Sequence, residues 1–355
     1  MTEEMKIIED SIPYLRHHRD DGKNLKGTVV FLKKNGEKET VSGYLKIPRA
    51  FHLGSAFRKI FGKQGAYVEE KMDGYNVRTC VIDGEFKAIT RGGLVCSYTT
   101  ERLNSEVNGK FFDDNPELML CGEVVGLQNP YQEKSYPEAE DFGYFVFDIR
   151  RKSDGKAVSI AEKEKLLKKY RLPHVRGFGL VKSPDRILKI VRKLGDYGRE
   201  GVVLKSADMT KILKYTANQS TNRDLEYAFE FYNDYGQAFM FQRLVREAFQ
   251  AYELGLKGKA LEKEAAEMGK SVMIPLVETI RKIAGGAEQT ENFEIEVPSR
   301  DFGTEFVDRL KHLGVVVTVD KIRRTKQGFT FSIKRHYHST NDKTKSFLNG
   351  GTVTE

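Results

Sequence analysis

The sequence predicts an α+β protein whose sheets are antiparallel. In the first two thirds of the chain, short apolar segments of alternating character are separated by Asn-Gly and Asp-Gly pairs, which is the pattern of β-hairpins. From residue 221 apolar residues recur at helical spacing, and after residue 289 strand-like and helical segments alternate. We therefore expect a strand-rich region, a helical region and a small α+β region, in this order.

Length and composition are typical of a globular protein of several domains. The 355 residues suffice for two or three domains, and the net charge of +8 fits a polyanionic partner such as nucleic acid. Cys80, Cys96 and Cys121 are widely spaced, which indicates neither a disulfide framework nor a zinc site. No stretch approaches the roughly 20 apolar residues of a membrane span. We expect a soluble, cytoplasmic protein.

Residues 1–66 are expected to form an N-terminal β-rich module. Two strand-like segments, 27–32 and 39–45, flank an Asn-Gly pair, which is a strong hairpin signal. Aromatic and aliphatic residues at near-helical spacing predict a short helix over 51–61. We assign no chemistry to this module.

Lys71 is the candidate nucleophile. A lysine attacks only as a neutral amine, so its pKa must fall below the free value of roughly 10.4 through burial or nearby positive charge. Its neighbours alternate as in a strand, and Asp73 and Gly74 then predict a turn that a ligand could approach closely. A solvated lysine in a surface hairpin is the alternative, and the tetrapeptide from Lys71 to Gly74 does not separate the two.

Arg91 and Glu123 are candidate ligand contacts. Arg91 follows a strand expected over 86–90 and precedes two glycines, so its guanidinium could fork onto ligand oxygens; an ordinary turn is the alternative. Glu123 is the lone carboxylate in an apolar strand expected over 118–126. A buried carboxylate needs a cation, a metal or hydrogen-bond donors such as a ribose diol, although a structural salt bridge would also satisfy it.

Phe145 and Phe147 alternate in a strand expected over 142–149, so their rings lie on one face. Either ring could stack on a planar base, or both could simply be core. Helices are expected next, over 163–170 and 184–194.

Glu200 lies at the start of a strand expected over 199–205, which ends in Lys205. Lys211 and Lys214 follow closely. Phosphate chemistry requires both an acid to hold Mg²⁺ and ammonium groups to neutralise oxyanions. The same lysines would lower the pKa of a lysine held beside them.

The order of these segments resembles motifs I, Ia, III, IIIa, IV and V of the covalent nucleotidyltransferase superfamily, which comprises polynucleotide ligases and mRNA capping enzymes. The matching segments are K-x-D-G at Lys71, R-G-G at Arg91, G-E-V-V-G around Glu123, V-F-D at Phe147, E-G-V-V-L-K at Glu200 and K-I-L-K-Y at Lys211. Within this superfamily the chain looks like the archaeal ATP-dependent RNA ligases, which carry an E-K-M-D-G-Y-N-V-R-type motif. The resemblance implies a nucleotidyltransferase domain over 67–220.

The resemblance also implies a role for each motif residue. Lys71 would take AMP from ATP, Glu123 would bind the ribose, and Phe147 would stack on adenine. Glu200 would bind Mg²⁺ or Mn²⁺, while Asp73 would help to position the lysine or the metal. The remaining residues assigned to the nucleotide or its phosphates are Glu70, Arg78, Arg91, Lys205, Lys211 and Lys214, with the choice of Lys211 or Lys214 as the main phosphate contact left open.

Asn76 separates the chain from other branches of the superfamily. DNA ligases and capping enzymes usually carry arginine two residues after the motif I glycine, where this chain has Asn76. We expect an ATP-dependent RNA ligase that joins 5′-phosphate and 3′-hydroxyl ends of RNA. The alternatives are a DNA ligase, a GTP-dependent capping-type enzyme, or an inactive nucleic-acid-binding relative.

Residues 221–288 are expected to form a helical domain. Thr221 and Asp224 resemble a capping pair, an aromatic-rich stripe continues to Tyr252, and two more helices are expected over 260–268 and 272–284. The stripe leaves room for a subunit interface, and the resemblance implies a homodimer through this region.

Residues 289–355 are expected to form a small basic α+β domain, with strands over 293–297, 315–319 and 328–333 and a helix over 304–313. Its interleaved basic and aromatic residues are typical of contact with an RNA backbone, although a solvated basic edge is as good an interpretation.

Overall fold

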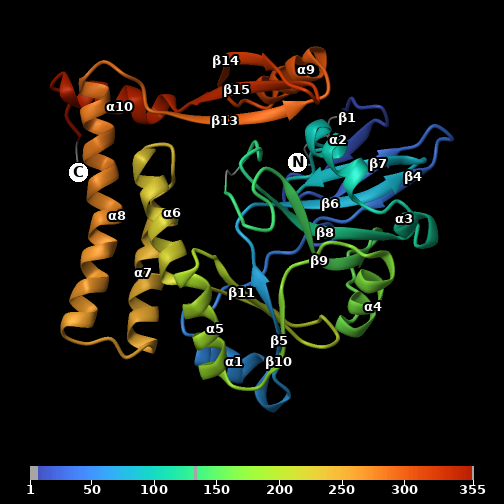
Figure 1. Cartoon of the computed structure of the whole chain (residues 1–355), viewed down its shortest axis with the longest axis horizontal. Helices are drawn as coiled ribbons and strands as arrows, with labels where there is room; N and C mark the ends of the chain where they lie inside the picture. Colours follow the sequence, from blue (N-terminus) through green and yellow to red (C-terminus); the bar gives the residue numbers. More distant parts are fainter. Residues whose placement is uncertain (1–6, 132–133, 354–355) are drawn as a thin grey trace. The chain divides into compact units, whose positions relative to one another are not determined.

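The computed structural model describes residues 7–131 and 134–353 and contains two compact units. Figure 1 shows the elements of both units, and each unit is treated separately below. The first unit comprises Met1–Pro48, Gln64–Lys182 and Val203–Lys214, and the second comprises Arg49–Lys63, Ser183–Val202 and Tyr215–Glu355. The expected α+β class is confirmed, whereas the four-domain division remains a prediction.

An antiparallel sheet of four strands opens the first unit. Its strands, in order, are β1 (Ile7–Ile8), β2 (Tyr14–Arg16), β3 (Val29–Leu32) and β4 (Lys38–Val41). The expected hairpin is β3–β4, in which Val29 pairs with Val41 across the Asn-Gly turn. Strands β1 and β2 were not predicted, because they are short and surrounded by polar residues.

A second antiparallel sheet has the order β7-β6-β8-β9. Its strands are β6 (Tyr75–Ile82), β7 (Glu85–Thr90), β8 (Leu118–Val125) and β9 (Gly143–Arg151). Three helices contribute apolar side chains to one core with these strands: α2 (Ser97–Glu106), α3 (Lys110–Asp114) and α4 (Ile160–Tyr170). Only α4 was predicted, since α2 and α3 carry few apolar residues at helical spacing.

The third sheet of this unit carries the candidate nucleophile. Its order is β10-β5-β11-β12, with β5 (Ala66–Lys71), β10 (Gly177–Val181), β11 (Gly201–Lys205) and β12 (Ile212–Thr216). Strand β10 pairs antiparallel with β5, Val181 opposite Ala66. Strand β10 was missed by the sequence analysis because three of its five residues are exposed.

The second unit is mostly helical. Its helices are α1 (Leu53–Ile60), α5 (Pro184–Asp196), α6 (Asn218–Glu230), α7 (Gln237–Glu253) and α8 (Lys259–Ala284). After α1, the 3₁₀ turn η1 (Gly62–Gln64) leads the chain back to the first unit. Helix α5 begins as predicted, because the Ser183 side chain accepts a hydrogen bond from the backbone of Arg186. Thr221 is not a cap: α6 begins earlier, and the Thr221 hydroxyl lies inside the helix. Helix α8 is one helix rather than two, and it continues through Pro275.

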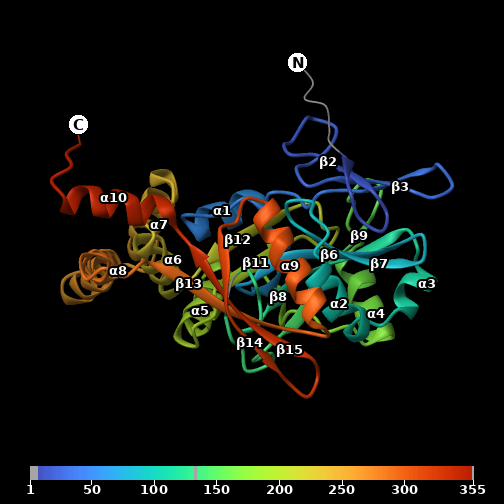
Figure 2. The same ribbon diagram turned by 90° about the horizontal axis from the view of Figure 1, so that it is seen from above.

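The C-terminal part of the second unit is a small α+β subdomain. Its antiparallel sheet has the order β13-β15-β14, with β13 (Thr290–Val297), β14 (Val317–Arg324) and β15 (Phe329–His336). Helix α9 (Arg300–His312) packs on this sheet, as Figure 2 shows, and α10 (His338–Leu348) follows. The three strands and α9 were predicted, whereas the predominantly polar helix α10 was not.

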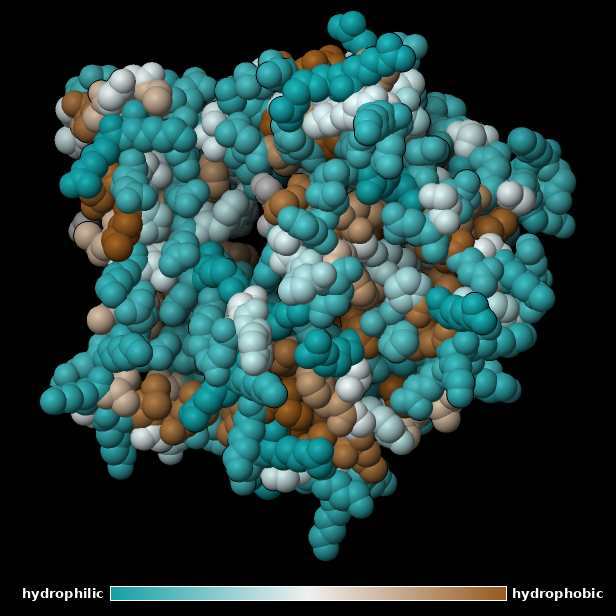
Figure 3. All heavy atoms as spheres, viewed as in Figure 1, coloured by the Kyte–Doolittle hydropathy of each residue, from teal (hydrophilic) through white to brown (hydrophobic). Residues whose placement is uncertain are grey.

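The surface of the helical part is mixed in character. Figure 3 shows hydrophobic residues among hydrophilic ones on the visible face of α8. Met273 and Ile274 on this helix are 59% and 49% exposed. Among the described helices, none is both long enough and apolar enough to cross a membrane.

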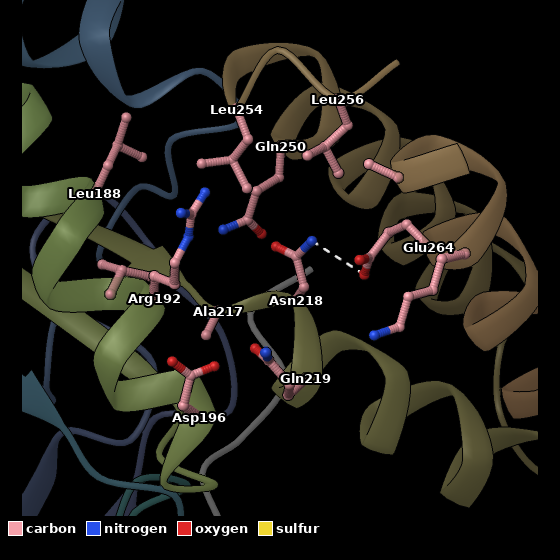
Figure 4. A pocket seen from close by; sticks show the side chains of 13 residues that line it. Leu188, Arg192, Asp196, Ala217, Asn218, Gln219, Gln250, Leu254, Leu256 and Glu264 are labelled. Atoms are coloured by element: carbon pink, nitrogen blue, oxygen red, sulfur yellow. Dashed lines mark hydrogen bonds between the residues drawn. The ribbon is translucent and has the colours of Figure 1, made fainter. Parts of the chain in front are cut away.

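A hollow of about 290 Å³ with a mixed polar and apolar lining lies among α5, α6, α7 and α8. Figure 4 shows the carboxamide side chains of Asn218, Gln219 and Gln250 around it. Asn218 donates a hydrogen bond to Glu264 at 3.2 Å, which links the start of α6 to α8.

Glu247 on α7 is 1% exposed, and it makes stability depend on pH. Burial first, and then the neighbouring Glu264, raise its pKa to about 8, against an opposing effect of Arg246. The unfolded carboxyl titrates near roughly 4.3, so its contribution to stability is complete below that pH and is lost as pH rises towards 8. We expect Glu247→Gln to raise the melting temperature at pH 8 by about 5 °C, since the amide carries no charge.

Thermal unfolding between pH 5 and pH 8.5 measures this effect, with the exposed Glu262→Gln on α8 as the matched control. The difference in melting temperature between Glu247→Gln and the wild type should become smaller as the pH falls towards 5. A constant difference at all pH values would contradict the raised pKa.

Candidate active site

Lys71 lies at the C-terminal end of β5, where the strand leaves the core. The three preceding residues, Val68, Glu69 and Glu70, are buried, while Lys71 is partly exposed. Its ammonium donates to the carbonyl oxygen of Met72 at 3.4 Å. The amine therefore lies at a boundary between core and surface, as expected for a group that must meet a ligand.

The turn after Lys71 is held in place by the segment between β8 and β9. The backbone N–H of Asp73 donates to the Tyr136 hydroxyl at 2.7 Å, and the Asp73 carboxylate accepts from Lys134 at 2.7 Å. Gly74 packs tightly on β8, because a Cβ there would lie 2.0 Å from the carbonyl oxygen of Val124. The motif I turn is thus restrained from three directions.

Glu123 and Phe147 lie on the two neighbouring strands β8 and β9. Glu123 is partly exposed and pairs in register with Asn76 of β6 and Phe145 of β9, so these three side chains share a face. Phe147 is half-buried and packs in one apolar cluster with Met72, the residue after the candidate nucleophile. The structure thereby joins the candidate adenine platform to the motif I strand.

The lysines of β11 and β12 can be placed relative to Lys71 by strand alternation. One apolar cluster contains a residue from each of three neighbouring strands: Tyr67, Val203 and Ile212. Side chains an even number of positions apart on a strand share a face, so Lys71, Lys205 and Lys214 lie on the face of this cluster. Lys211 is exposed and precedes β12. This geometry favours Lys214 over Lys211 as the phosphate contact.

Lys205 differs from the expectation, because it is only 1% exposed. Its ammonium donates to Glu69 at 2.6 Å, to Asp148 at 2.8 Å and to the carbonyl oxygen of Phe147 at 2.8 Å. A lysine has three N–H donors, so the predicted phosphate contact, which stays a prediction, would have to replace one of these hydrogen bonds. Lys205 joins β5, β9 and β11 on the same sheet face as Lys71 but fully buried, and Lys163 of α4 makes a second ion pair with Glu69.

These charges hold one another ionised. Burial alone would raise the pKa of Asp148, but Lys205 and Arg150 hold it well below its usual range. Burial alone would lower the pKa of Lys205, but Asp148 and Glu69 raise it. Lys163 is different, since burial and the nearby Lys205 lower its pKa.

Arg78 also differs from the expectation. It is 0% exposed, and its guanidinium donates to backbone carbonyl oxygens, including Gly27 at 2.8 Å and Thr90 at 3.0 Å, as well as Ser42. Burial lowers its pKa to about 10. Arg78 therefore ties the N-terminal sheet to the β6–β7 hairpin, and its nucleotide contact stays a prediction.

Glu70 and Arg91 occupy contrasting positions. Glu70 is 4% exposed, and its carboxylate lies 3.9 Å from the guanidinium of Arg176. Arg91 is exposed at the end of β7, and its backbone N–H donates to Asn76 at 3.1 Å. Arg91 is therefore accessible to a ligand, whereas Glu70 supports the motif I strand from inside.

Glu200 belongs to the second unit and directly precedes β11. It is 8% exposed, and its carbonyl oxygen accepts from the backbone of Ala217 at 2.8 Å. Burial lowers the pKa of Arg49 and of Arg243, and the nearby charge of Glu200 opposes this lowering in both. A carboxylate oxygen is a ligand that Mg²⁺ prefers. The two nearby guanidinium groups would repel a cation, so a cation bound here would need an accompanying anion.

Known proteins resemble this chain over nearly its whole length. Residues 65–216 match the RNA ligase family, and residues 227–351 match the C-terminal region of ligase Pab1020. Two solved forms of an archaeal ATP-dependent RNA ligase superpose with a TM-score of 0.93 at 36% identity; the first covers 98% of this chain and 93% of its own. The chain belongs to the archaeal ATP-dependent RNA ligase family. The resemblance drawn from the motifs is confirmed.

Two further relatives extend the family. An uncharacterised protein of Methanocaldococcus jannaschii is 38% identical over 337 residues, which is 92% of this chain and 85% of the relative. A protein of Aquifex aeolicus assigned by name to the ATP-dependent DNA ligases has a TM-score of 0.91 at 28% identity, with 99% of this chain and 96% of that chain covered. The fold is thus shared by proteins named for different nucleic acids.

Lys134 and Tyr136 were missed by the sequence analysis. They lie 61 and 63 residues after Asp73, in an irregular segment without a motif. A lysine and a tyrosine close to a motif III strand were the only signal, and surface lysines of this kind are common.

We expect Lys134→Met to slow the adenylation of Lys71 by about tenfold, because the Asp73 carboxylate would lose a charged hydrogen bond worth about 1.5 kcal/mol. Single-turnover labelling with α-³²P-ATP measures the rate. Lys165→Met, at an exposed position of α4, is the matched control. Equal rates for Lys134→Met and the control would show that the contact does not position the turn.

Proposed function

We propose that this chain is an ATP-dependent RNA ligase that joins 5′-phosphate and 3′-hydroxyl ends of RNA. The observation that carries the proposal is Lys71, placed at the edge of the core on the sheet face that also carries Lys214, in a chain of the archaeal RNA ligase family. Phe147 and Glu123 on adjacent strands add an aromatic ring and a carboxylate to the same unit.

The proposed reaction consists of three group transfers. The Lys71 amine attacks the α-phosphorus of ATP, loses a proton, and displaces pyrophosphate. AMP then passes from the protonated Lys71 nitrogen to an oxygen of the RNA 5′-phosphate, which forms a 5′,5′-pyrophosphate linkage. Finally the RNA 3′-hydroxyl attacks that 5′-phosphate, loses its proton, and displaces AMP, leaving a phosphodiester.

Each remaining site residue has a proposed task. Glu123 accepts hydrogen bonds from the ribose, Phe147 stacks on adenine, and Arg91 contacts the ribose or the RNA end. Lys214 neutralises phosphate oxygens. Asp73 positions Lys71 through the turn that Lys134 restrains.

Glu200 is the residue proposed to hold a divalent ion, Mg²⁺ or Mn²⁺. Its hard carboxylate oxygens suit either ion. When bound, the ion would offset the charge that develops on the phosphate oxygens.

We further propose a cytoplasmic homodimer that associates through the helical region. Support for the dimer comes from exposed apolar residues on α7 and α8, such as Phe241 at 66%, Tyr252 at 77% and Met273 at 59%. Support for a reducing compartment comes from the three cysteines, which are buried and free.

Nucleotide-dependent labelling followed by sealing assays tests this function. We expect α-³²P-ATP, and not α-³²P-GTP, to label the protein, and the labelled protein to seal 5′-phosphorylated RNA. A single 5′-phosphorylated RNA strand also reports circularisation, since the circle resists phosphatase and exonuclease. GTP labelling, or no RNA product from a labelled protein, would contradict the proposal.

DNA ligation is the second candidate function. It is favoured by the likeness to the Aquifex aeolicus protein, which is named for DNA. Nicked and single-stranded DNA substrates belong in the same assay, and faster sealing of DNA than of matched RNA would favour this candidate.

A further inference from the structure

Three arginines of the second unit lie near two carboxylates, one of which is the motif IV glutamate. Arg49 precedes α1, whereas Arg243 and Arg246 lie one turn apart on α7. The carboxylates are Asp224 of α6 and Glu200, which directly precedes β11. These five side chains, called the arginine cluster below, combine residues separated by almost 200 positions (Arg49 and Arg246).

One carboxylate oxygen serves two of the arginines. The Oδ2 atom of Asp224 accepts from Arg243 Nε at 2.8 Å and lies 3.4 Å from Arg246 NH2. Arg246 Nε also donates to the Thr221 hydroxyl at 3.1 Å, and Arg49 donates to the hydroxyl of Thr216. Asp224 thus holds the α6–α7 side of the cluster together, but it supplies only one negative charge to two guanidinium groups.

The cluster has more positive than negative charge. Three arginines face Asp224 and Glu200, while burial raises the pKa of the neighbouring Glu247 to about 8, so this third carboxyl is largely uncharged at neutral pH. Arg246 is 4% exposed. Burial first, and then the charge of Arg246, lower the pKa of Arg49 to about 10, and burial likewise lowers the pKa of Arg243. Burying a guanidinium without a full counter-charge costs free energy, which a bound anion would offset.

We propose that Arg49, Arg243 and Arg246 form a binding subsite for a phosphate-type oxyanion beside Glu200. Guanidinium groups present forked donors that match two phosphate oxygens, and arginine is the preferred residue where such bidentate contacts are needed. The adjacent Glu200 supplies a carboxylate for a cation that accompanies the anion. If the cluster were purely structural, it would need no ligand and would bind no phosphate anion.

Two sources of this anion are compatible with the chemistry, namely the pyrophosphate part of ATP and the 5′-phosphate of RNA. The identity of the source rests on the proposed function, but the binding of a phosphate anion does not. Binding of inorganic pyrophosphate, measured without ATP or RNA, therefore tests the subsite even in a chain that ligates nothing.

Isothermal titration with pyrophosphate and Mg²⁺ compares the wild type with Arg49→Gln and Arg243→Gln. We expect each variant to bind about tenfold or more weakly, since each loses a charge-assisted contact. Arg58→Gln, at an exposed position of α1, is the matched control and should bind as the wild type does. Melting temperatures verify that each variant is folded.

Asp224→Asn gives a test of opposite sign. Because it removes a negative charge from the arginine cluster, we expect tighter pyrophosphate binding than in the wild type. Titration with 5′-phosphorylated and 5′-hydroxyl RNA distinguishes the two sources of the anion. If Arg49→Gln binds 5′-phosphorylated RNA more weakly than the wild type but binds 5′-hydroxyl RNA equally well, the subsite belongs to the RNA end. If only the affinity for pyrophosphate falls, the subsite belongs to the nucleotide. Unchanged affinity of the folded Arg49→Gln and Arg243→Gln variants for both ligands would overturn the proposal.

Discussion

Lys71→Ala is expected to abolish formation of the protein–AMP adduct. The amine is the only atom of this side chain that can form a phosphoramidate, so its removal should lower labelling by at least about 10⁴-fold, the size of loss seen when a nucleophile is deleted. Incubation with α-³²P-ATP, followed by denaturing electrophoresis, measures the adduct.

Lys63→Ala is the matched control, because Lys63 is an exposed lysine outside the candidate active site. A second measurement separates loss of the nucleophile from loss of the fold. RNA that already carries a 5′-adenylate needs no lysyl intermediate, so Lys71→Ala should still seal it. Adduct formation by Lys71→Ala would refute the nucleophile assignment.

Lys205→Met is expected to destabilise the first unit by about 3–5 kcal/mol, because it leaves Asp148 and Glu69 without a buried counter-charge. Urea unfolding measures the free energy. The exposed Lys165→Met provides the baseline for losing a lysine, and the double variant Lys205→Met with Asp148→Asn should recover part of the loss.

The same variant decides between two roles of Lys205. If the ammonium contacts phosphate, Lys205→Met would raise the KM for ATP while the free energy of unfolding stays unchanged. The buried position instead predicts that the free energy of unfolding falls, while the KM for ATP changes little. The pKa of Asp148 is lowered in the folded chain, so its contribution to stability is present above pH of about 4 and is lost as pH falls further.

Local sequence rules predicted most of the elements that carry the motifs. The β3–β4 hairpin follows from its Asn-Gly turn, and α5 follows from its serine cap and apolar spacing. Errors arose where tertiary contacts outweigh local preference. Helix α8 continues through Pro275, whose ring is buried, and α6 starts before the polar pair that resembled its cap.

Motif spacing likewise predicted the family, because six short segments in order constrain a chain far more than one lysine does. Motif spacing could not predict which charged side chains are buried or which partners they have. Lys205 looks like a phosphate ligand in sequence, yet its three partners come from two strands, 57 to 136 residues away. Arg78 is bound by carbonyl oxygens from Gly27 and Ser42, and a backbone carbonyl has no sequence signature.

The sequence by itself determined the family, the candidate nucleophile Lys71 and most of the strands that carry the motifs, because these depend on residue type and on short-range periodicity. Only the tertiary structure showed which cations are buried among protein partners and which are exposed. Lys134, Lys205 and the arginine cluster make their contacts with partners distant along the chain. Burial makes an unpaired charge costly, and burial is a property of the whole fold rather than of any segment.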